Sequence, residues 1–491
     1  MKNASGWSAF ALLASGILSP QLDARSAAIQ LEPCRLENSS RVNSIAARCG
    51  YLEVPENPGA PNGAKIRLRV ALIAALRSQS AAEPLFIVSG GPGSAAGQFY
   101  AMVAGAFERI RRDRDLVVVD QRGTGESGAL DCDFPEDFDV DQLPMDRLRE
   151  LITDCRDKLK GRQLEYYTTS VAVRDLDLVR AALGYQRIAL YGVSYGTRVV
   201  EHYARRFPEH TRAVILDGVI VPELPVGPAI AIDAQSTLNR ILAACDRDAE
   251  CQQKFPNLAP RLAILLDSVT RRPRALDLPD PVTGRSEHIE VTRDYIVAAV
   301  RLLSYNSQTI AVLPLLLDEA ARNNLGPLVA QAVMTTRALT DQLSIGMHNS
   351  VVCAEDVPFY ESGNIDRAVL ARTYIGTNQV DGLLEICKIW PRGVVDADFH
   401  APLHSSVPAL LLSGELDPVT PPANGAATAK EFLDSLHIIA AGQGHGQLGT
   451  GCMPRLMAQF IDAGSARNLD ASCTRAIAGL PFFLSFSGPA P

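Results

Sequence analysis

The sequence predicts an α/β fold, with a mostly parallel β-sheet covered by helices and a helical segment inserted between two groups of strands. Short apolar runs alternate with stretches whose apolar residues recur at helical spacing, which is the pattern of successive strand–helix units. The alternation stops after residue 222 and resumes near residue 406, and the stretch between is mostly helical in its periodicity. A serine between two glycines, Ser194, follows directly on one of the apolar runs.

The elements before the insertion are expected in the order that a parallel sheet requires. A helix is predicted over 170–186, where a C-cap glycine, Gly184, ends the apolar periodicity. A second helix follows Ser194 and ends at Pro208. Ser194 therefore lies between a buried strand and a helix. The expected strands cover residues 64–76, 84–93, 114–125, 187–196 and 212–222.

Two more strands are expected after the insertion, over 407–422 and 436–446, with a helix over 423–435 between them. The last residues, 474–491, are expected to form a surface tail with an apolar anchor. The chain then divides into a signal peptide (1–28), the first part of the core (29–222), a helical cap (223–405) and the second part of the core (406–491).

The net charge indicates whether nucleic acid is a partner, and the N-terminal residues indicate where the protein is located. The chain has 47 Lys and Arg residues against 55 Asp and Glu, a net charge of −8, and no long basic run, so we expect no nucleic-acid partner. Lys2 precedes a short apolar run from Trp7 to Leu18, and small residues follow at 26–28. This pattern predicts a secretory signal peptide and a secreted or periplasmic protein without stable membrane insertion.

Ten cysteines agree with export, because an even number of cysteines in an exported chain indicates disulfides. No Cys-x-x-Cys motif or zinc-type spacing of His and Cys occurs, so we expect no bound metal. The connectivity stays open at this point. Pairing in sequence order would join Cys34 to Cys49, Cys132 to Cys155, Cys245 to Cys251, Cys353 to Cys387 and Cys452 to Cys473.

The stretch Gly-Val-Ser-Tyr-Gly around Ser194 fits the G-x-S-x-G elbow, a sharp strand-to-helix turn that lifts a serine hydroxyl above a sheet. Side chains at Gly192 or Gly196 would collide with the neighbouring strand and helix. The five-residue pattern alone is weak evidence for a nucleophilic serine. Its predicted position between a strand and a helix makes the evidence stronger, because the elbow requires that position. We expect Ser194 to be a nucleophile.

A nucleophilic serine needs a histidine base that is oriented by a carboxylate. In this fold the chain order is serine, acid, histidine, with each residue after a strand. Asp417 lies just beyond the apolar run "PALLLSG" (408–414), with Glu415 as the fallback acid, and His445 lies just beyond "LHIIAAGQG" (436–444). His437 would lie within that strand, and the other six histidines precede the acid.

The reaction also needs two backbone amides that hold the negative charge developing on the substrate carbonyl. One donor is expected to be the amide of Tyr195, directly after the nucleophile. The other is expected in the glycine-rich loop at 89–93, where the backbone can approach a ligand closely.

Five stretches together resemble the proline iminopeptidase and tripeptidyl aminopeptidase group of α/β-hydrolases. The resemblance implies Ser194 as nucleophile, Asp417 as acid, His445 as base and Gly91 as the second oxyanion donor. Ser89 departs from the usual histidine of the iminopeptidase loop, which favours the tripeptidyl branch. The stretches are "SGGPG" (89–93), "DQRGTGES" (120–127), "GVSYGTR" (192–198), "LSGELDPVTPP" (412–422) and "GQGHG" (442–446), with "SVVCAEDVPF" (350–359) and "CKIWP" (387–391) resembling the tripeptidyl branch.

An aminopeptidase must bind the free ammonium of its substrate, and carboxylates near the cap would do so. Glu355 and Asp356 are the candidates, with Glu223 behind them. Within "DQRG", Arg122 is expected to be a buried salt-bridge partner, because an arginine cannot act as a base near neutral pH.

These observations predict an exported serine hydrolase that needs no cofactor, most simply an aminopeptidase that releases an N-terminal residue or a tripeptide. A carboxylesterase acting on small esters is the first alternative, because the same three residues serve both reactions. A non-catalytic binding protein is the second, and an intact triad argues against it. The expected partner is a peptide or small ester substrate, and the oligomeric state stays open.

Overall fold

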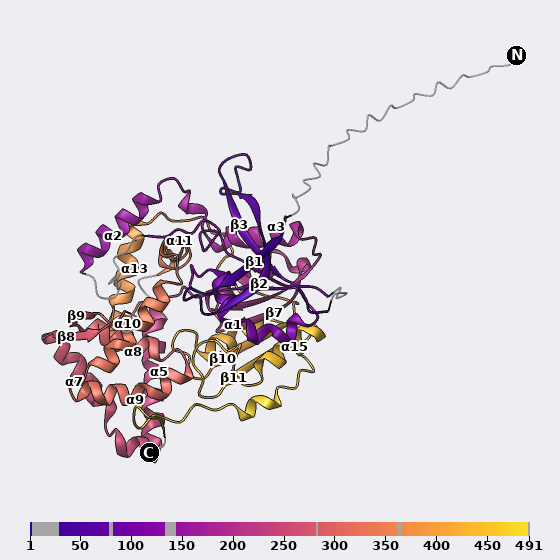
Figure 1. The fold of residues 1–491 in the computed structure, drawn as a ribbon. Coiled ribbons are helices and arrows are strands. Elements are labelled where there is room, and N and C mark those ends of the chain that lie inside the picture. Colours follow the sequence, from indigo (N-terminus) through magenta and orange to yellow (C-terminus); the bar gives the residue numbers. More distant parts are fainter. Residues whose placement is uncertain (2–28, 78–81, 133–143, 281–282, 361–364, 490–491) are drawn as a thin grey trace.

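Among the described residues, a nine-stranded sheet forms the centre of the molecule, in the order β1-β2-β3-β5-β4-β6-β7-β10-β11 (Figure 1). This computed structural model describes residue 1 and residues 29–77, 82–132, 144–280, 283–360 and 365–489. The predicted signal peptide, apart from Met1, falls outside these ranges.

The strand pairs β1–β2, β2–β3 and β3–β5 are antiparallel. The other five pairs, from β5–β4 to β10–β11, are parallel. The α/β prediction is confirmed, while the first two strands were not expected from the sequence. The bounds are β1 Glu32–Glu37, β2 Ser44–Pro55, β3 Lys65–Ile73, β4 Leu85–Val88, β5 Leu116–Val119, β6 Ile188–Val193, β7 Thr211–Asp217, β10 Ala409–Gly414 and β11 Ser435–Ala440.

Helices cover both faces of this sheet, which explains why its central strands are continuous apolar runs. In β4, Phe86 and Val88 belong to the hydrophobic cluster that contains α3 (Thr169–Ala182) and α4 (Tyr195–Arg206). Leu85 and Ile87 point the other way, into the cluster that contains the helices α1 (Ala96–Arg111) and α15 (Met453–Ala463). The short helix α14 (Pro422–Thr428) follows β10 and ends earlier than the sequence predicted.

The chain between β7 and β10 is mostly helical, and most of it packs around a hydrophobic core of its own (Figure 1). Met347 and Val351 on α11 (Ile345–Glu355) belong instead to the cluster that contains α3 and α4. A two-stranded hairpin within this helical segment, β8 and β9, was not predicted. Phe483, in the C-terminal segment, packs against this core, and its amide donates to the Ala311 carbonyl at 2.9 Å. The bounds are α5 Pro228–Arg247, α6 Ala249–Lys254, α7 Leu258–Arg271, β8 Arg274–Pro279, β9 Ser286–Val291, α8 Arg293–Leu303, α9 Ser307–Ala321, α10 Gly326–Thr340, α11 Ile345–Glu355, α12 Arg367–Leu370 and α13 Asn378–Ile389, while α2 (Met145–Lys158) precedes α3.

All ten cysteines are paired in sequence order, so the simplest connectivity is correct. Within the described part of the chain, no helix has the length and apolar character needed to cross a membrane. The disulfides are Cys34–Cys49, Cys132–Cys155, Cys245–Cys251, Cys353–Cys387 and Cys452–Cys473.

Candidate active site

Ser194 occupies the turn between β6 and α4 with φ 56° and ψ −124°, a backbone conformation that is strained for any residue with a side chain. The flanking glycines make this turn possible. A Cβ atom on Gly192 would lie 2.3 Å from the Gly196 carbonyl oxygen, and one on Gly196 would lie 2.6 Å from the Val88 carbonyl oxygen. The Ser194 amide donates to the Asp217 carbonyl at 2.9 Å, which ties the elbow to the neighbouring strand.

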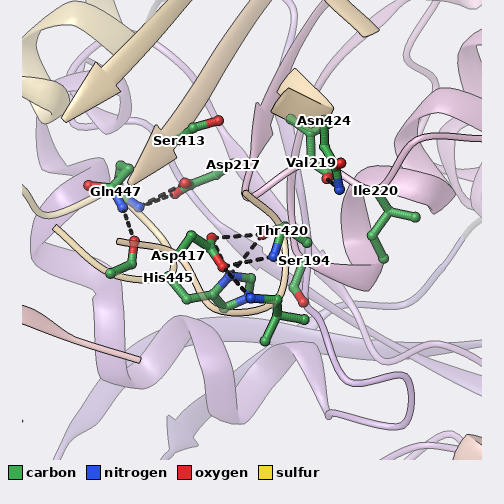
Figure 2. Close-up of polar contacts among 12 residues, drawn as sticks. Ser194, Asp217, Val219, Ile220, Ser413, Asp417, Thr420, Asn424, His445 and Gln447 are labelled. Carbon is green, nitrogen blue, oxygen red and sulfur yellow. Dashed lines mark hydrogen bonds and ion pairs between the residues drawn. The ribbon is translucent and has the colours of Figure 1, made fainter. Parts of the chain in front are cut away.

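Asp417 lies in the turn after β10, and its side chain is fully buried. Oδ1 accepts the backbone amides of Val419 and Thr420 at 2.9 and 2.8 Å. Oδ2 accepts the Thr420 hydroxyl at 2.7 Å and faces the His445 ring. Oδ1 therefore stabilises the turn through backbone amides, whereas Oδ2 contacts His445 (Figure 2).

His445 follows β11, and its Nδ1 lies 2.7 Å from Asp417 Oδ2. Its amide donates to the Tyr305 carbonyl at 2.6 Å, which joins the histidine loop to the end of α8. Burial would lower the pKa of the imidazole, but the charge and hydrogen bond of Asp417 outweigh it, so the pKa of His445 lies above its ordinary value. With Nδ1 held by the acid, Nε2 is the nitrogen left for a proton transfer.

The end of β7 contacts both Ser194 and His445. A Cβ atom on Gly218 would lie 2.9 Å from His445 Cε1, and the preceding residue, Asp217, accepts the Ser194 amide. Figure 2 shows Ser194, Asp417 and His445 in one group. No hydrogen bond among the described residues joins Ser194 Oγ to His445, and such contacts are often loose before substrate binds.

Tyr195 and Gly91, whose amides are predicted to hold an oxyanion, lie in the two segments next to Ser194. Tyr195 is the first residue of α4, so its N–H has no partner within the helix and lies at the positive end of the helix dipole. Gly91 is exposed and has φ 115°, a conformation that favours glycine. The adjacent Gly90 lies against Ser194, because a Cβ atom there would be 3.0 Å from Ser194 Cβ. Ser89 donates to the Ser94 carbonyl at 2.8 Å and so closes this loop.

The "DQRG" stretch supports the site without facing it. Asp120 accepts the Gly97 amide at 2.9 Å, and Gln121 donates to the Tyr195 hydroxyl at 3.0 Å. Arg122 forms a buried two-pronged ion pair with Asp175, at 2.7 and 2.8 Å, as the sequence predicted.

Asp217 is a site residue that sequence reasoning missed. Its fully buried carboxylate accepts the Gln447 amide at 2.7 Å, the Leu448 amide at 2.9 Å and the Tyr191 hydroxyl at 2.9 Å. Burial raises the pKa of this carboxyl to about 6, against the opposing effect of those hydrogen bonds. Asp217 thus clamps the loop that follows His445. The available signal was a lone aspartate that ends an apolar strand in "AVILDG".

Glu355 and Asp356 are not placed as accessible carboxylates. Glu355 accepts the amide and hydroxyl of Thr169 at 2.6 and 2.9 Å, and burial raises its pKa to about 7. Asp356 pairs with Arg198 at 2.8 Å, and both acids are at most 1% exposed. These contacts give them a structural role beneath α4, and the ammonium-binding role remains a prediction. Glu223, the third candidate, lies on the loop between β7 and α5.

Two protein families match the chain, one on each side of the helical segment, and both matches extend into it. The family described as "alpha/beta hydrolase fold" matches residues 83–251, which include Ser194, and the family "TAP-like protein" matches residues 372–473, which include Asp417 and His445. With its fold and its enzyme relatives, the protein is a serine hydrolase of the α/β-hydrolase class.

Three relatives specify the family further. Serine protease Hip1 of Mycobacterium tuberculosis is 26% identical over 91% of each chain. Tripeptidyl aminopeptidase of Streptomyces lividans is 33% identical over 36% of each chain. Carboxylesterase B of Mycobacterium tuberculosis is 29% identical over 48% of this chain and 51% of its own. The chain thus has the α/β-hydrolase fold and is similar to serine peptidases of the tripeptidyl aminopeptidase type.

Proposed function

We propose that this protein is an exported serine aminopeptidase in which Ser194, His445 and Asp417 form the catalytic triad. The observation that carries the proposal is the pairing of His445 Nδ1 with the buried Asp417 carboxylate at 2.7 Å, beside a strained serine elbow. The five disulfides support export, because disulfides persist in oxidising compartments.

In the proposed reaction, His445 Nε2 takes the proton of Ser194 Oγ as the oxygen attacks the scissile carbonyl carbon. The amides of Gly91 and Tyr195 hold the oxyanion of the tetrahedral intermediate. The protonated His445 then gives its proton to the leaving amine, the acyl group stays on Ser194, and water releases it by the reverse sequence. Asp417 stabilises the imidazolium and fixes the ring tautomer.

The substrate class rests on the family. The match to the TAP-like family spans the acid and the base, and two relatives are named as peptidases. We therefore propose that the acyl group is the amino-terminal residue or a short amino-terminal peptide of a substrate with a free α-amine.

The test compares the wild-type protein with Ser194→Ala on alanyl, prolyl and tripeptidyl p-nitroanilides with free or acetylated amino termini. We expect turnover of the free-amine anilides, with loss of turnover on acetylation and in the variant. Turnover that survives in Ser194→Ala would refute the nucleophile. Equal turnover of free and acetylated anilides would refute aminopeptidase activity and leave serine hydrolysis intact.

A carboxylesterase is the second candidate function. The observation that favours it is that Glu355 and Asp356 are buried among protein partners, so the carboxylates predicted to bind an ammonium are occupied. A relative named Carboxylesterase B covers about half of the chain. Turnover of p-nitrophenyl esters by the wild type, without turnover of any anilide, would establish this alternative.

A further inference from the structure

A groove of about 1090 Å³ reaches the candidate base, and His445 itself lines it. Its walls come mainly from α1, the connection between α8 and α9, the histidine loop after β11, and the C-terminal segment. Figure 1 shows this last segment, in yellow, running from α15 toward α9, where the Phe483 amide bonds to Ala311. The groove is larger than the range of about 300–1,000 Å³ that is typical of small-molecule sites, so it has room for several residues of an extended chain.

The groove adjoins the groups that react in the proposed mechanism. Val193, which lines it, is the residue directly before Ser194. Tyr305 also lines it, and its ring packs edge to face against the His445 imidazole with 5.5 Å between the ring centres. The His445 side chain is 12% exposed, so a ligand in the groove can reach the imidazole.

The proton transfer to the leaving group decides which part of a substrate lies in this groove. Protonated His445 gives its proton to the leaving amine, so that nitrogen must come within hydrogen-bond distance of the ring. The leaving chain starts at this nitrogen, whereas the acyl group is bonded to Ser194 Oγ. A groove that starts at His445 therefore suits the leaving chain.

The walls of the groove are uncharged. Among the described residues that line it there is no aspartate, glutamate, lysine or arginine. A charged side chain would lose hydration there without gaining an ion partner. The groove thus favours a leaving chain with uncharged, apolar side chains. Its own apolar side chains include Phe99, Met102 and Val103 on α1 and Ile477 and Leu480 on the C-terminal segment.

Two links hold the C-terminal wall of the groove against the histidine loop. The disulfide Cys452–Cys473 joins the two segments, and both cysteines line the groove. Gln443 Nε2 donates to the Ala478 carbonyl at 2.8 Å. Because this wall is already fixed, a bound chain does not have to order it.

We propose that this groove is the leaving-chain subsite, and that it selects substrates with uncharged, apolar residues directly after the scissile bond. The inference rests on the proposed peptidase function. It concerns the chain that remains after cleavage and not the amino-terminal segment that is released.

The first test keeps the acyl group constant and changes the leaving chain. The acyl group is the one whose p-nitroanilide the wild type cleaves fastest, and it is joined to Leu-Leu-amide, Asp-Asp-amide or Lys-Lys-amide, with products separated by chromatography. The wild type should cleave the Leu-Leu substrate with a kcat/KM roughly tenfold above either charged one. Since acidic and basic chains should both be disfavoured, the net charge of the protein would not explain the result. Equal values for the three peptides would overturn the selectivity.

Two glycines allow the groove to be filled without strain. A Cβ atom on Gly105, on α1, or on Gly449, in the histidine loop, would meet nothing within 4 Å beyond its own chain neighbours, and both residues line the groove. Gly105→Phe and Gly449→Phe should lower the ratio of kcat/KM for the Leu-Leu substrate to that for the p-nitroanilide roughly tenfold. Gly161→Phe is the matched control, because Gly161 is exposed, has equally open surroundings and does not line the groove. The midpoint of thermal unfolding reports the folding of each variant.

Gly105→Arg tests the selection by charge. The new cation should raise kcat/KM for the Asp-Asp substrate relative to the Leu-Leu substrate by roughly twofold to fivefold, a gain that misfolding cannot produce. Unchanged ratios in the folded phenylalanine and arginine variants would overturn the subsite. A wild type that cleaves esters but no anilide or peptide would instead overturn the peptidase function, and this failure is distinguished because it occurs in the wild type.

Discussion

Replacing Asp417 by asparagine tests how the acid orients the base. Oδ1 of Asp417 accepts two backbone amides, from Val419 and Thr420, whereas Oδ2 faces the Thr420 hydroxyl and His445 Nδ1. The single oxygen of the new amide would replace Oδ1, because an NH₂ group there would face two N–H donors. The NH₂ group would then face His445 and force Nδ1 to accept, with the ring proton on Nε2.

The hydrogen bonds of Asp417 determine how much activity Asp417→Asn should lose. Turning the amide to restore the productive tautomer leaves two buried N–H groups without acceptors, at about 1–3 kcal/mol each. The productive state is therefore disfavoured by roughly 2–6 kcal/mol, or about 30-fold to about 10⁴-fold in its population. Loss of the charge that stabilises the imidazolium adds to this, so we expect a loss in kcat near the upper end, about 10⁴-fold.

The assay is kcat and kcat/KM for p-nitrophenyl esters and for any anilide that the wild type cleaves. Glu415→Gln is the matched control, because Glu415 is exposed and accepts the Gly442 amide instead of facing the histidine. That variant should stay close to the wild type. An Asp417→Asn protein within about tenfold of the wild type would refute the proposed role of the acid.

Three further predictions follow from buried charges. Because Asp417 raises the pKa of His445 and only the neutral ring accepts a proton, kcat/KM should fall about tenfold per pH unit below that pKa, and a flat pH profile would contradict the base assignment. Asp217→Asn should move this acidic limb to lower pH, because the Asp217 charge helps to raise the pKa of His445; an unshifted limb would show that it does not act on the ring. Arg122→Met should destabilise the fold by roughly 3–5 kcal/mol in urea unfolding, because it leaves Asp175 buried and unpaired, whereas Arg147→Met on an exposed pair should change little.

Sequence reasoning succeeded where local pattern and chain order agree. The central strands are buried on both faces and read as apolar runs, and the elbow at Ser194 has glycines that only a tight turn requires. Asp417 and His445, each following a strand in the expected order, do pair in the structure, and their catalytic roles stay predictions. The disulfides also follow sequence order, as short loops between neighbouring elements allow.

The misses have two physical causes: weak local strand patterns at β1, β2 and the β8–β9 hairpin, and contacts between distant segments elsewhere. The N-terminal strands β1 and β2 alternate between buried and exposed residues over short stretches, and the β8–β9 hairpin lies in a region of helical periodicity. The burial of Glu355 and Asp356 depends on Thr169 and Arg198, which are more than 150 residues away. The clamp made by Asp217 spans 230 residues to Gln447. No local pattern reports such pairs.

Covalent labelling of the nucleophile tests the central claim most directly. Diisopropyl fluorophosphate is attacked by an activated serine, and mass spectrometry of the digested protein locates the phosphorylated residue. The account predicts a single label on Ser194, with complete loss of hydrolysis, and no label in Ser194→Ala. A label on another residue that abolishes activity, or full labelling of the Ser194→Ala protein, would contradict it.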